Sequence, residues 1–148
     1  YLFQGASIQV ELNENFQTQN LDNHRSCYQA AINESLFEML LINLASNAVK
    51  YNESITPELI VSISRNEKSI FIQFSDNGIG IERKQSKKIF KKFYQTARSN
   101  IQMVKGSGIG LYLVQNIIQV HKGSIKVTSL GKGKGATFTI SIPALTRH

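Results

Sequence analysis

The chain has 148 residues, of which 41% are hydrophobic, and this is enough for one hydrophobic core in one globular domain. A single cysteine, Cys27, excludes an internal disulfide, and the longest apolar stretch, residues 36–44, is far shorter than the ~20 residues that cross a bilayer. The net charge of +7 is concentrated between Arg83 and Lys105, a segment with eight basic residues and no acidic one, and is therefore a local feature rather than a general sign of nucleic-acid binding.

The N-terminal part of the sequence indicates where the folded domain begins. Residues 1–6 resemble what remains of an engineered protease site, and we expect a single domain over residues 7–148. Ser7–Leu12 alternates apolar and polar residues, which predicts an edge strand. Residues 13–25 are compatible with a short helix or a loop, and a second short strand is predicted at residues 28–32.

A long amphipathic helix is predicted from Asn33, a suitable N-cap, to Tyr51. Its apolar residues recur at spacings of three and four, at Leu36, Phe37, Leu40, Leu41, Leu44 and Ala48. A different stripe of the same helix carries Asn43, Asn47 and Lys50, where an amide oxygen suits Mg²⁺ and a lysine suits phosphate. An ordinary polar helix face would look the same.

Two alternating runs, residues 59–63 and 70–74, predict an antiparallel hairpin. The sequence Asp-Asn-Gly-Ile-Gly at residues 76–80 comes directly after its second strand. A carboxylate in this position can accept hydrogen bonds from the amino group of a base, and the glycines allow the backbone to approach closely. Asp-Asn-Gly is also simply a good turn.

A short basic helix is predicted after Gly80, with its apolar side made by Ile89, Phe90 and Phe93. Four lysines would share the opposite face, namely Lys84, Lys87, Lys88 and Lys91. They would steer an acidic nucleotide, contact a partner protein, or simply remain solvated. The aperiodic segment at residues 96–105 predicts a mobile loop.

Alternating glycines lead into the last predicted helix, which runs from Ile109 to about His121 and ends at Gly123. These glycines would let backbone amides and the positive helix end form a phosphate cradle, and they are Gly106, Gly108 and Gly110. No strand precedes them, which argues against a dinucleotide-binding Rossmann site, and the Walker pattern is absent.

Two final strands, residues 124–130 and 136–142, are predicted on either side of a glycine-rich turn at residues 131–135. Strand runs interleaved with three helices predict an α/β two-layer sandwich. We expect a mixed, largely antiparallel sheet that is covered on one face by about three helices.

These motifs, in this order and spacing, closely resemble the GHKL or Bergerat-fold ATPases, and among them the histidine kinases. The resemblance covers residues 35–143. The matching segments are the asparagine box at residues 43–51, the first glycine box at 76–80, the phenylalanine box at 89–93, the second glycine box at 106–111 and the terminal glycine-containing hairpin at 131–138.

The resemblance implies a domain that binds ATP with Mg²⁺. Asn47 would coordinate the metal, and Asn43 and Lys50 would support the phosphates. Asp76 would bind the adenine amino group, and Arg98 would act on the γ-phosphate from a lid at residues 95–105. The other residues implied at the nucleotide are Tyr51, Gly78, Gly80, Phe93, Lys105, Gly106, Gly108, Ile109, Gly110, Leu111 and Thr137.

Asn43 separates a kinase from a hydrolase within this superfamily. Members that hydrolyse ATP place a glutamate four residues before the metal-binding asparagine, and Asn43 occupies that place here. Hydrolysis without a carboxylate lacks its general base, whereas transfer to an imidazole needs mainly positioning and charge neutralisation. The resemblance therefore implies a protein-histidine kinase rather than an ATPase or a serine kinase of the anti-sigma type.

None of the three histidines, His24, His121 and His148, lies in a phosphoacceptor motif. We therefore expect the dimerisation and phosphoacceptor helices elsewhere in the same protein or on a partner chain, with the receiver domain of a response regulator downstream. The expected setting is the cytoplasmic domain of a membrane-anchored bacterial sensor, with no nucleic acid and no direct membrane contact. Two alternatives stay open: a degenerate nucleotide-binding regulatory module without phosphotransfer, and an ATPase of the same superfamily.

Overall fold

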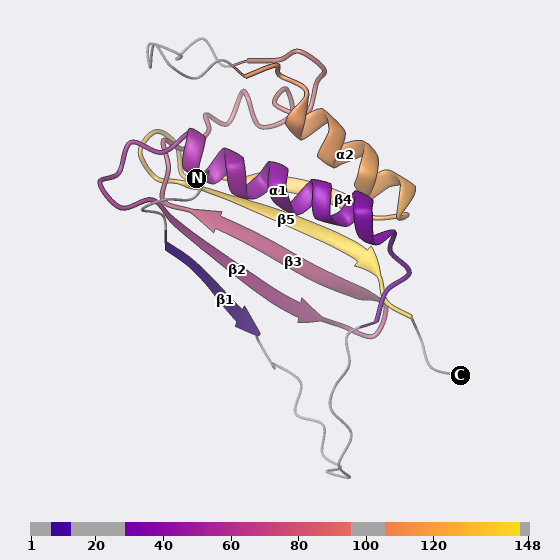
Figure 1. The fold of residues 1–148 in the computed structure, drawn as a ribbon. Coiled ribbons are helices and arrows are strands. Elements are labelled where there is room, and N and C mark those ends of the chain that lie inside the picture. Colours follow the sequence, from indigo (N-terminus) through magenta and orange to yellow (C-terminus); the bar gives the residue numbers. More distant parts are fainter. Residues whose placement is uncertain (1–6, 13–28, 96–105, 146–148) are drawn as a thin grey trace.

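The computed structural model describes residues 7–12, 29–95 and 106–145. A five-stranded sheet in the order β1-β2-β3-β5-β4 forms one layer, and two helices lie across one of its faces (Figure 1). The pair β1-β2 is parallel and the other three pairs are antiparallel, so the predicted two-layer, largely antiparallel sandwich is confirmed. The elements are β1 Ser7–Leu12, α1 Glu34–Lys50, β2 Glu58–Arg65, β3 Ser69–Asp76, α2 Gly110–Val120, β4 Ser124–Thr128 and β5 Ala136–Pro143.

The core lies between the sheet and the two helices. Buried and less buried residues alternate strictly along β5. The buried residues face the helices, and the residues between them lie on the open face of the sheet. The helices contribute the side chains at the spacing that the sequence predicts. The main buried residues are Leu40, Leu44 and Ala48 of α1, Val114, Ile117 and Ile118 of α2, and Ala136, Phe138, Ile140 and Ile142 of β5.

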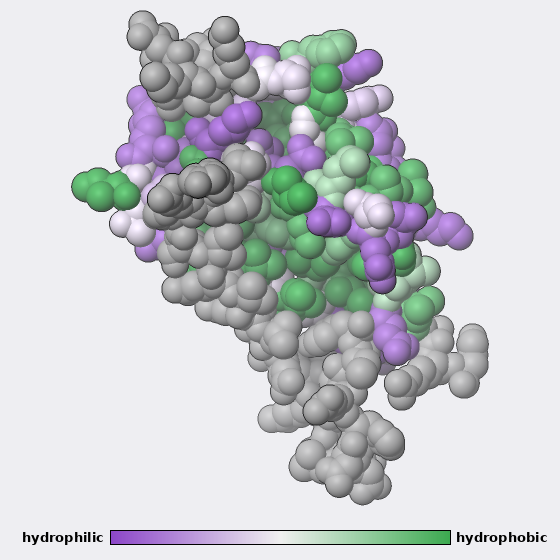
Figure 2. Space-filling model, in the orientation of Figure 1, coloured by the Kyte–Doolittle hydropathy of each residue, from purple (hydrophilic) through white to green (hydrophobic). Residues whose placement is uncertain are grey.

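The helical layer is narrower than the sheet. Val61 and Ile63 of β2 point toward the helix side but are only half-buried, and Leu41 of α1 is exposed. Apolar side chains accordingly gather at the surface between α1 and the strands below it in Figure 2.

Helix α1 begins and ends as the sequence predicts. The side chain of Asn33 accepts a hydrogen bond from the backbone amide of Leu36 at 3.0 Å, which satisfies a free donor of the first turn. At the other end, the amide of Tyr51 bonds to the carbonyl of Asn47 at 3.0 Å. The amide of Ile79 bonds to the carbonyl of Tyr51 at 2.9 Å, so the C-terminal end of the helix lies at the end of the sheet where β3 finishes (Figure 1).

The strand predicted at residues 28–32 is wrong for the residues that the structure describes there. Gln29, Ala31 and Ile32 are exposed and only Ala30 packs against the core, so the alternation does not bury a continuous face. One backbone hydrogen bond, from Leu145 to the carbonyl of Gln29, connects this stretch to the end of β5, and no ladder continues it. An alternating pattern without a sheet neighbour does not form a strand.

The basic helix predicted after Gly80 is also wrong. Residues 83–92 form successive turns, mostly with i to i+3 hydrogen bonds such as the one from the amide of Lys88 to the carbonyl of Gln85. Lysines spaced four apart would repel one another on a helix, as at Lys84 and Lys88. The four lysines therefore do not share a helix face, and the described part of the chain has two α-helices with this turn segment beside them.

The end of α2 shows why Gly123 is a glycine, and the reason differs from the expected one. Lys122, not Gly123, adopts the left-handed conformation, with φ of 56°. The amides of Lys122 and Gly123 bond to the carbonyls of Gln119 and Ile118, which is a Schellman motif. A Cβ on Gly123 would lie 2.4 Å from the carbonyl oxygen of Ser141, so glycine is required here by the close approach of β5.

Candidate active site

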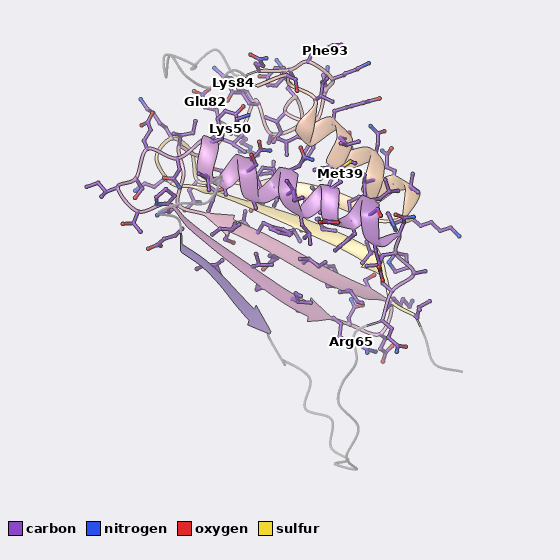
Figure 3. The ribbon with its side chains drawn as sticks, in the orientation of Figure 1. Met39, Lys50, Arg65, Glu82, Lys84 and Phe93 are labelled. Carbon is purple, nitrogen blue, oxygen red and sulfur yellow. The ribbon has the colours of Figure 1, made fainter. Side chains whose placement is uncertain are left out.

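One pocket opens between the C-terminal half of α1, the loop after β3 and the start of α2, with a cavity volume of about 220 Å³. Lys50 lies at the end of α1 that faces the turn segment bearing Glu82 and Lys84 (Figure 3). The pocket brings together three segments that are far apart in the sequence and that carry the predicted motifs. This pocket is therefore the candidate active site.

Asp76 is the only carboxylate among the described residues that line the pocket. Its Oδ1 accepts hydrogen bonds from the backbone amides of Gly78 at 2.9 Å and Ala136 at 3.2 Å. Within the described part of the chain Oδ2 has no such partner, and no polar side-chain atom there is both buried and unpaired, so Oδ2 remains open to the pocket. Burial raises the pKa of Asp76, while the two backbone hydrogen bonds act in the opposite direction.

Glycines build the wall beside Asp76 out of main-chain atoms. Gly80 has φ of 73°, and a Cβ there would lie 1.9 Å from the carbonyl oxygen of Gly131. The amide of Gly133 bonds to the carbonyl of Ile79 at 2.7 Å, and that of Gly135 bonds to the carbonyl of Gly78 at 3.0 Å. The loop after β3 is thus joined to the β4-β5 turn, backbone to backbone.

Gly80→Ala is expected to lower the free energy of unfolding by about 2–3 kcal/mol, because it adds both left-handed strain and a steric clash. Gly133→Ala is a matched control: φ is 70°, but nothing lies within 4 Å of its added Cβ. It should cost about 1 kcal/mol from strain alone. Chemical denaturation of both variants measures the difference, and equal losses would contradict the predicted clash.

Helix α1 supplies the polar side of the pocket. Asn43, Asn47 and Lys50, which the spacing places on one stripe, all line it, and so does Tyr51, which the family resemblance implied. The Asn43 amide donates to the carbonyl of Met39 at 2.7 Å, whereas the Asn47 side chain has no hydrogen-bond partner among the described residues. Asn47 therefore has a free amide for a ligand.

The glycines that lead into α2, the last of which is its first residue, make room for groups of α1 and for the chain near Phe93. A Cβ on Gly110 would lie 2.7 Å from Oδ1 of Asn43, and one on Gly106 would lie 3.3 Å from the hydroxyl of Tyr51. The carbonyl of Gly108 accepts a hydrogen bond from the amide of Phe93 at 2.9 Å. The second glycine segment and the asparagine helix are therefore packed directly against each other.

Ten of the predicted site residues line the pocket: Asn43, Asn47, Lys50, Tyr51, Asp76, Gly80, Gly106, Gly108, Gly110 and Leu111. Four described residues do not, namely Gly78, Phe93, Ile109 and Thr137. The ring of Phe93 is 63% exposed, with Nζ of Lys92 4.9 Å from its centroid. Thr137 lies on the open face of the sheet, where its hydroxyl contacts that of Ser75 at 3.0 Å. Arg98, Lys105 and nearly all of the predicted lid lie outside the described residues.

Several lining residues were not predicted at the site: Ser46, Ile79, Ile81, Ile89, Tyr94, Gln95, Ser107, Ala136 and Phe138. Ala136 pairs with Asp76 in the β3-β5 register, so strand pairing brings β5 to the pocket. The side chain of Gln95 donates to the carbonyl of Gly106 and joins the two described ends on either side of residues 96–105. The alternation of β5 predicts that Ala136 and Phe138 face the helices, but not that they reach this pocket.

Residues 32–146 match the family of histidine kinase-, DNA gyrase B- and HSP90-like ATPases. The chain belongs to this family. Several of the curated relatives that it resembles are named as histidine kinases, and they identify it further as a histidine-kinase-type ATPase domain. This confirms the family and the fold inferred from the asparagine and glycine motifs.

Sensor protein RprX of Bacteroides fragilis is 41% identical to this histidine-kinase-type domain over 108 residues, which are 72% of the chain and 20% of RprX. SenX3 of Mycolicibacterium smegmatis is 36% identical over 118 residues, 78% of the chain and 30% of SenX3. WalK of Bacillus subtilis is 32% identical over 113 residues, 76% of the chain and 18% of WalK. The chain thus spans less than a third of each relative.

Solved structures share the fold of the histidine-kinase-type domain. The mycobacterial sensor histidine kinase MprB superimposes with a TM-score of 0.76 at 17% identity, covering 98% of this chain and 86% of that one. The full-length ShkA structure in complex with AMPPNP gives a TM-score of 0.71 at 23% identity, covering 97% of this chain and 27% of that one.

Neither of the two helices in the described residues has the length and the apolar character that a membrane-spanning helix needs.

Proposed function

We propose that this domain binds Mg-ATP and transfers the γ-phosphoryl group to a histidine on a separate dimerisation and phosphoacceptor domain, in two-component signal transduction. The observation that carries the proposal is Asp76. Two backbone amides fix one carboxylate oxygen, and the other is open to a pocket that the amide stripe of α1 also lines. The ShkA structure, which has the same fold, is a complex with the nucleotide analogue AMPPNP, and this supports a nucleotide as the ligand here.

The described residues fit an ATP with its metal. Asp76 would accept a hydrogen bond from the adenine amino group through Oδ2, and Lys50 would meet the phosphates. Asn47 would hold Mg²⁺ with its unpartnered amide oxygen, and the metal would neutralise charge on the phosphates. No group of three or more His, Cys, Asp or Glu residues in the described part could hold a metal alone, which agrees with a metal that depends on its nucleotide.

Asn43 supports transfer to histidine over hydrolysis. Asp76 is the one carboxylate among the described residues that line the pocket, and it stands at the end of β3, whereas the position on α1 four residues before Asn47 is the amide Asn43. The Asn43 amide is held by Met39, with its oxygen against the start of α2. A neutral amide in this place cannot take a proton from water.

The phosphoacceptor is proposed to lie outside the described residues. The Nδ1 of His121 lies 2.6 Å from the carbonyl of Ile117, and its Nε2 accepts from the amide of Asn33 at 2.9 Å. Both ring nitrogens are therefore engaged. Acceptor helices of the same protein or a partner chain, a downstream receiver domain and a cytoplasmic setting in a membrane-anchored sensor remain part of the proposal.

Transfer of label from γ-labelled ATP with Mg²⁺ to the acceptor helices, supplied in cis or in trans, tests the proposal, with Asn47→Ala as control. Acid-labile, alkali-stable label that depends on Asn47 would support a histidine kinase. ATP binding without label on a competent acceptor would favour a regulatory nucleotide-binding module. Rapid phosphate release would instead favour an ATPase and contradict the role given to Asn43.

ATP affinity is expected to fall on acidification through the raised pKa of Asp76, above the ordinary value of 3.8, because the ionised carboxylate is the better acceptor. The stability of the free domain should move the other way. Because the folded domain raises the pKa of Asp76, the contribution of this carboxyl to the free energy of unfolding is complete below the unfolded pKa. It is lost as pH rises through the folded pKa. Calorimetric titrations with ATP across this pH range would measure the loss of affinity. The same titrations of Asp76→Asn, which report the titration of ATP itself, are subtracted. Identical profiles would contradict it.

A further inference from the structure

Ser129 lies directly after β4, at the start of the glycine-rich turn that leads to β5. Its hydroxyl donates to the carbonyl of Gly135 at 2.6 Å and accepts from the amides of Ile81 at 3.0 Å and Gly131 at 3.2 Å. The carbonyl of Gly131 is a second, more distant acceptor at 3.4 Å. A hydroxyl has one donor and two acceptor sites, so the three shorter bonds use its whole capacity. One small side chain therefore connects both ends of the turn to the loop after β3.

The loop after β3 forms the wall of the pocket at Ile79, Gly80 and Ile81. Among the described residues, three hydrogen bonds tie this loop to residues 129–135. Two are backbone to backbone, at the carbonyls of Gly78 and Ile79, and the third is the bond from Ile81 to Ser129. Ser129 thus provides the one side-chain bond in the junction, while it does not itself line the pocket.

We propose that Ser129 is a positioning residue that holds the base-binding wall of the pocket in register with Asp76. The inference rests on the proposed ATP-binding function. Without the hydroxyl, the amide of half-buried Ile81 and the carbonyl of buried Gly135 would lose their partner, and such groups carry a desolvation cost. The wall would then shift relative to Asp76, whose Oδ1 is anchored to the next residue along, Ala136.

The effect should be confined to the base end of the pocket. The polar stripe of α1 and the glycines before α2 belong to other elements, and Ser129 makes no hydrogen bond to them in the described part of the chain. A positioning role weakens the affinity of every folded molecule. A merely structural role reduces the number of folded molecules and leaves the affinity of the remainder unchanged.

Calorimetric titration of the domain with ATP and Mg²⁺ separates these two roles, because it gives the dissociation constant and the binding stoichiometry independently. Ser129→Ala is expected to raise the Kd for ATP about tenfold at unchanged stoichiometry, the size expected for a lost half-buried hydrogen bond. Ser129→Cys keeps a weaker donor and acceptor and should give a smaller rise. If the alanine variant does not fold, the cysteine variant provides the test.

Ser75→Ala is the matched control. It also removes a half-buried hydroxyl with a hydrogen bond, to Thr137 at 3.0 Å, but on the open face of the sheet, and ATP affinity should stay within about twofold of wild type. A Kd for Ser129→Ala equal to that of the wild type, or a reduced stoichiometry at unchanged Kd, would overturn the inference alone. Failure of the wild-type domain to bind ATP would instead overturn the proposed function.

Discussion

Asn47→Ala is expected to slow phosphoryl transfer on the order of 10²–10³-fold, because a bound metal contributes several kcal/mol of charge stabilisation in such reactions. The variant removes the amide oxygen proposed to bind Mg²⁺. The fold should not suffer, since the Asn47 side chain has no hydrogen-bond partner among the described residues and alanine favours a helix. Initial rates of label transfer from γ-labelled ATP to the acceptor helices measure the effect.

Asn116→Ala provides the matched control for this variant. It makes the same change on a helix, in α2, at a residue that does not line the pocket and whose amide donates to the carbonyl of Tyr112 at 2.9 Å. Its transfer rate should stay within a few-fold of wild type. Equal rates for Asn47→Ala and wild type would remove Asn47 from the proposed metal site.

Asp76→Asn is expected to weaken ATP binding by roughly 10- to 100-fold, although the two side chains have the same shape. The amides of Gly78 and Ala136 both need an acceptor at the Oδ1 position. The asparagine would therefore place its oxygen there and turn its NH₂ group toward the pocket. An NH₂ group facing the adenine amino group sets donor against donor, so the binding bond is lost.

The same variant should fold normally, because both backbone amides keep their acceptor and a desolvated charge is removed. Calorimetry with ATP and thermal unfolding of the free domain would measure the two properties. Glu67→Gln neutralises a carboxylate in the exposed β2-β3 turn and should change neither. Unaltered ATP affinity in Asp76→Asn would contradict the assignment of the base-binding wall.

Long periodic patterns predict this fold well because they record burial directly. The apolar spacing of α1, its cap at Asn33 and the alternation of β2, β3 and β5 all correspond to observed elements. The same reasoning gave a wrong prediction for residues 83–92, because this segment is short and carries lysines that disfavour a helix. Their path is decided by Ile89 and Phe90, which are buried in the core next to each other in sequence.

Motif residues of the candidate site are predictable where each motif is local. Asn43 and Asn47 share a helix stripe, and Asp76 ends a strand, so each local geometry follows from the chain itself. The contribution of Ala136 depends on pairing between strands sixty residues apart, which no local pattern contains. Phe93 was expected at the nucleotide because it belongs to the phenylalanine box, but its backbone at φ of 62° bonds to Gly108 and leaves the ring outside.

The base-binding wall is held in place largely by main-chain hydrogen bonds, which involve the peptide groups of Gly78, Ile79 and Gly135. Side-chain substitutions near this loop, other than at the glycines and at Ser129, leave these main-chain bonds intact. An inhibitor that packs against this wall at Ile79, Gly80 and Ile81 would therefore meet a surface whose position few single substitutions can change. The same property would make such a compound hard to restrict to one member of the family.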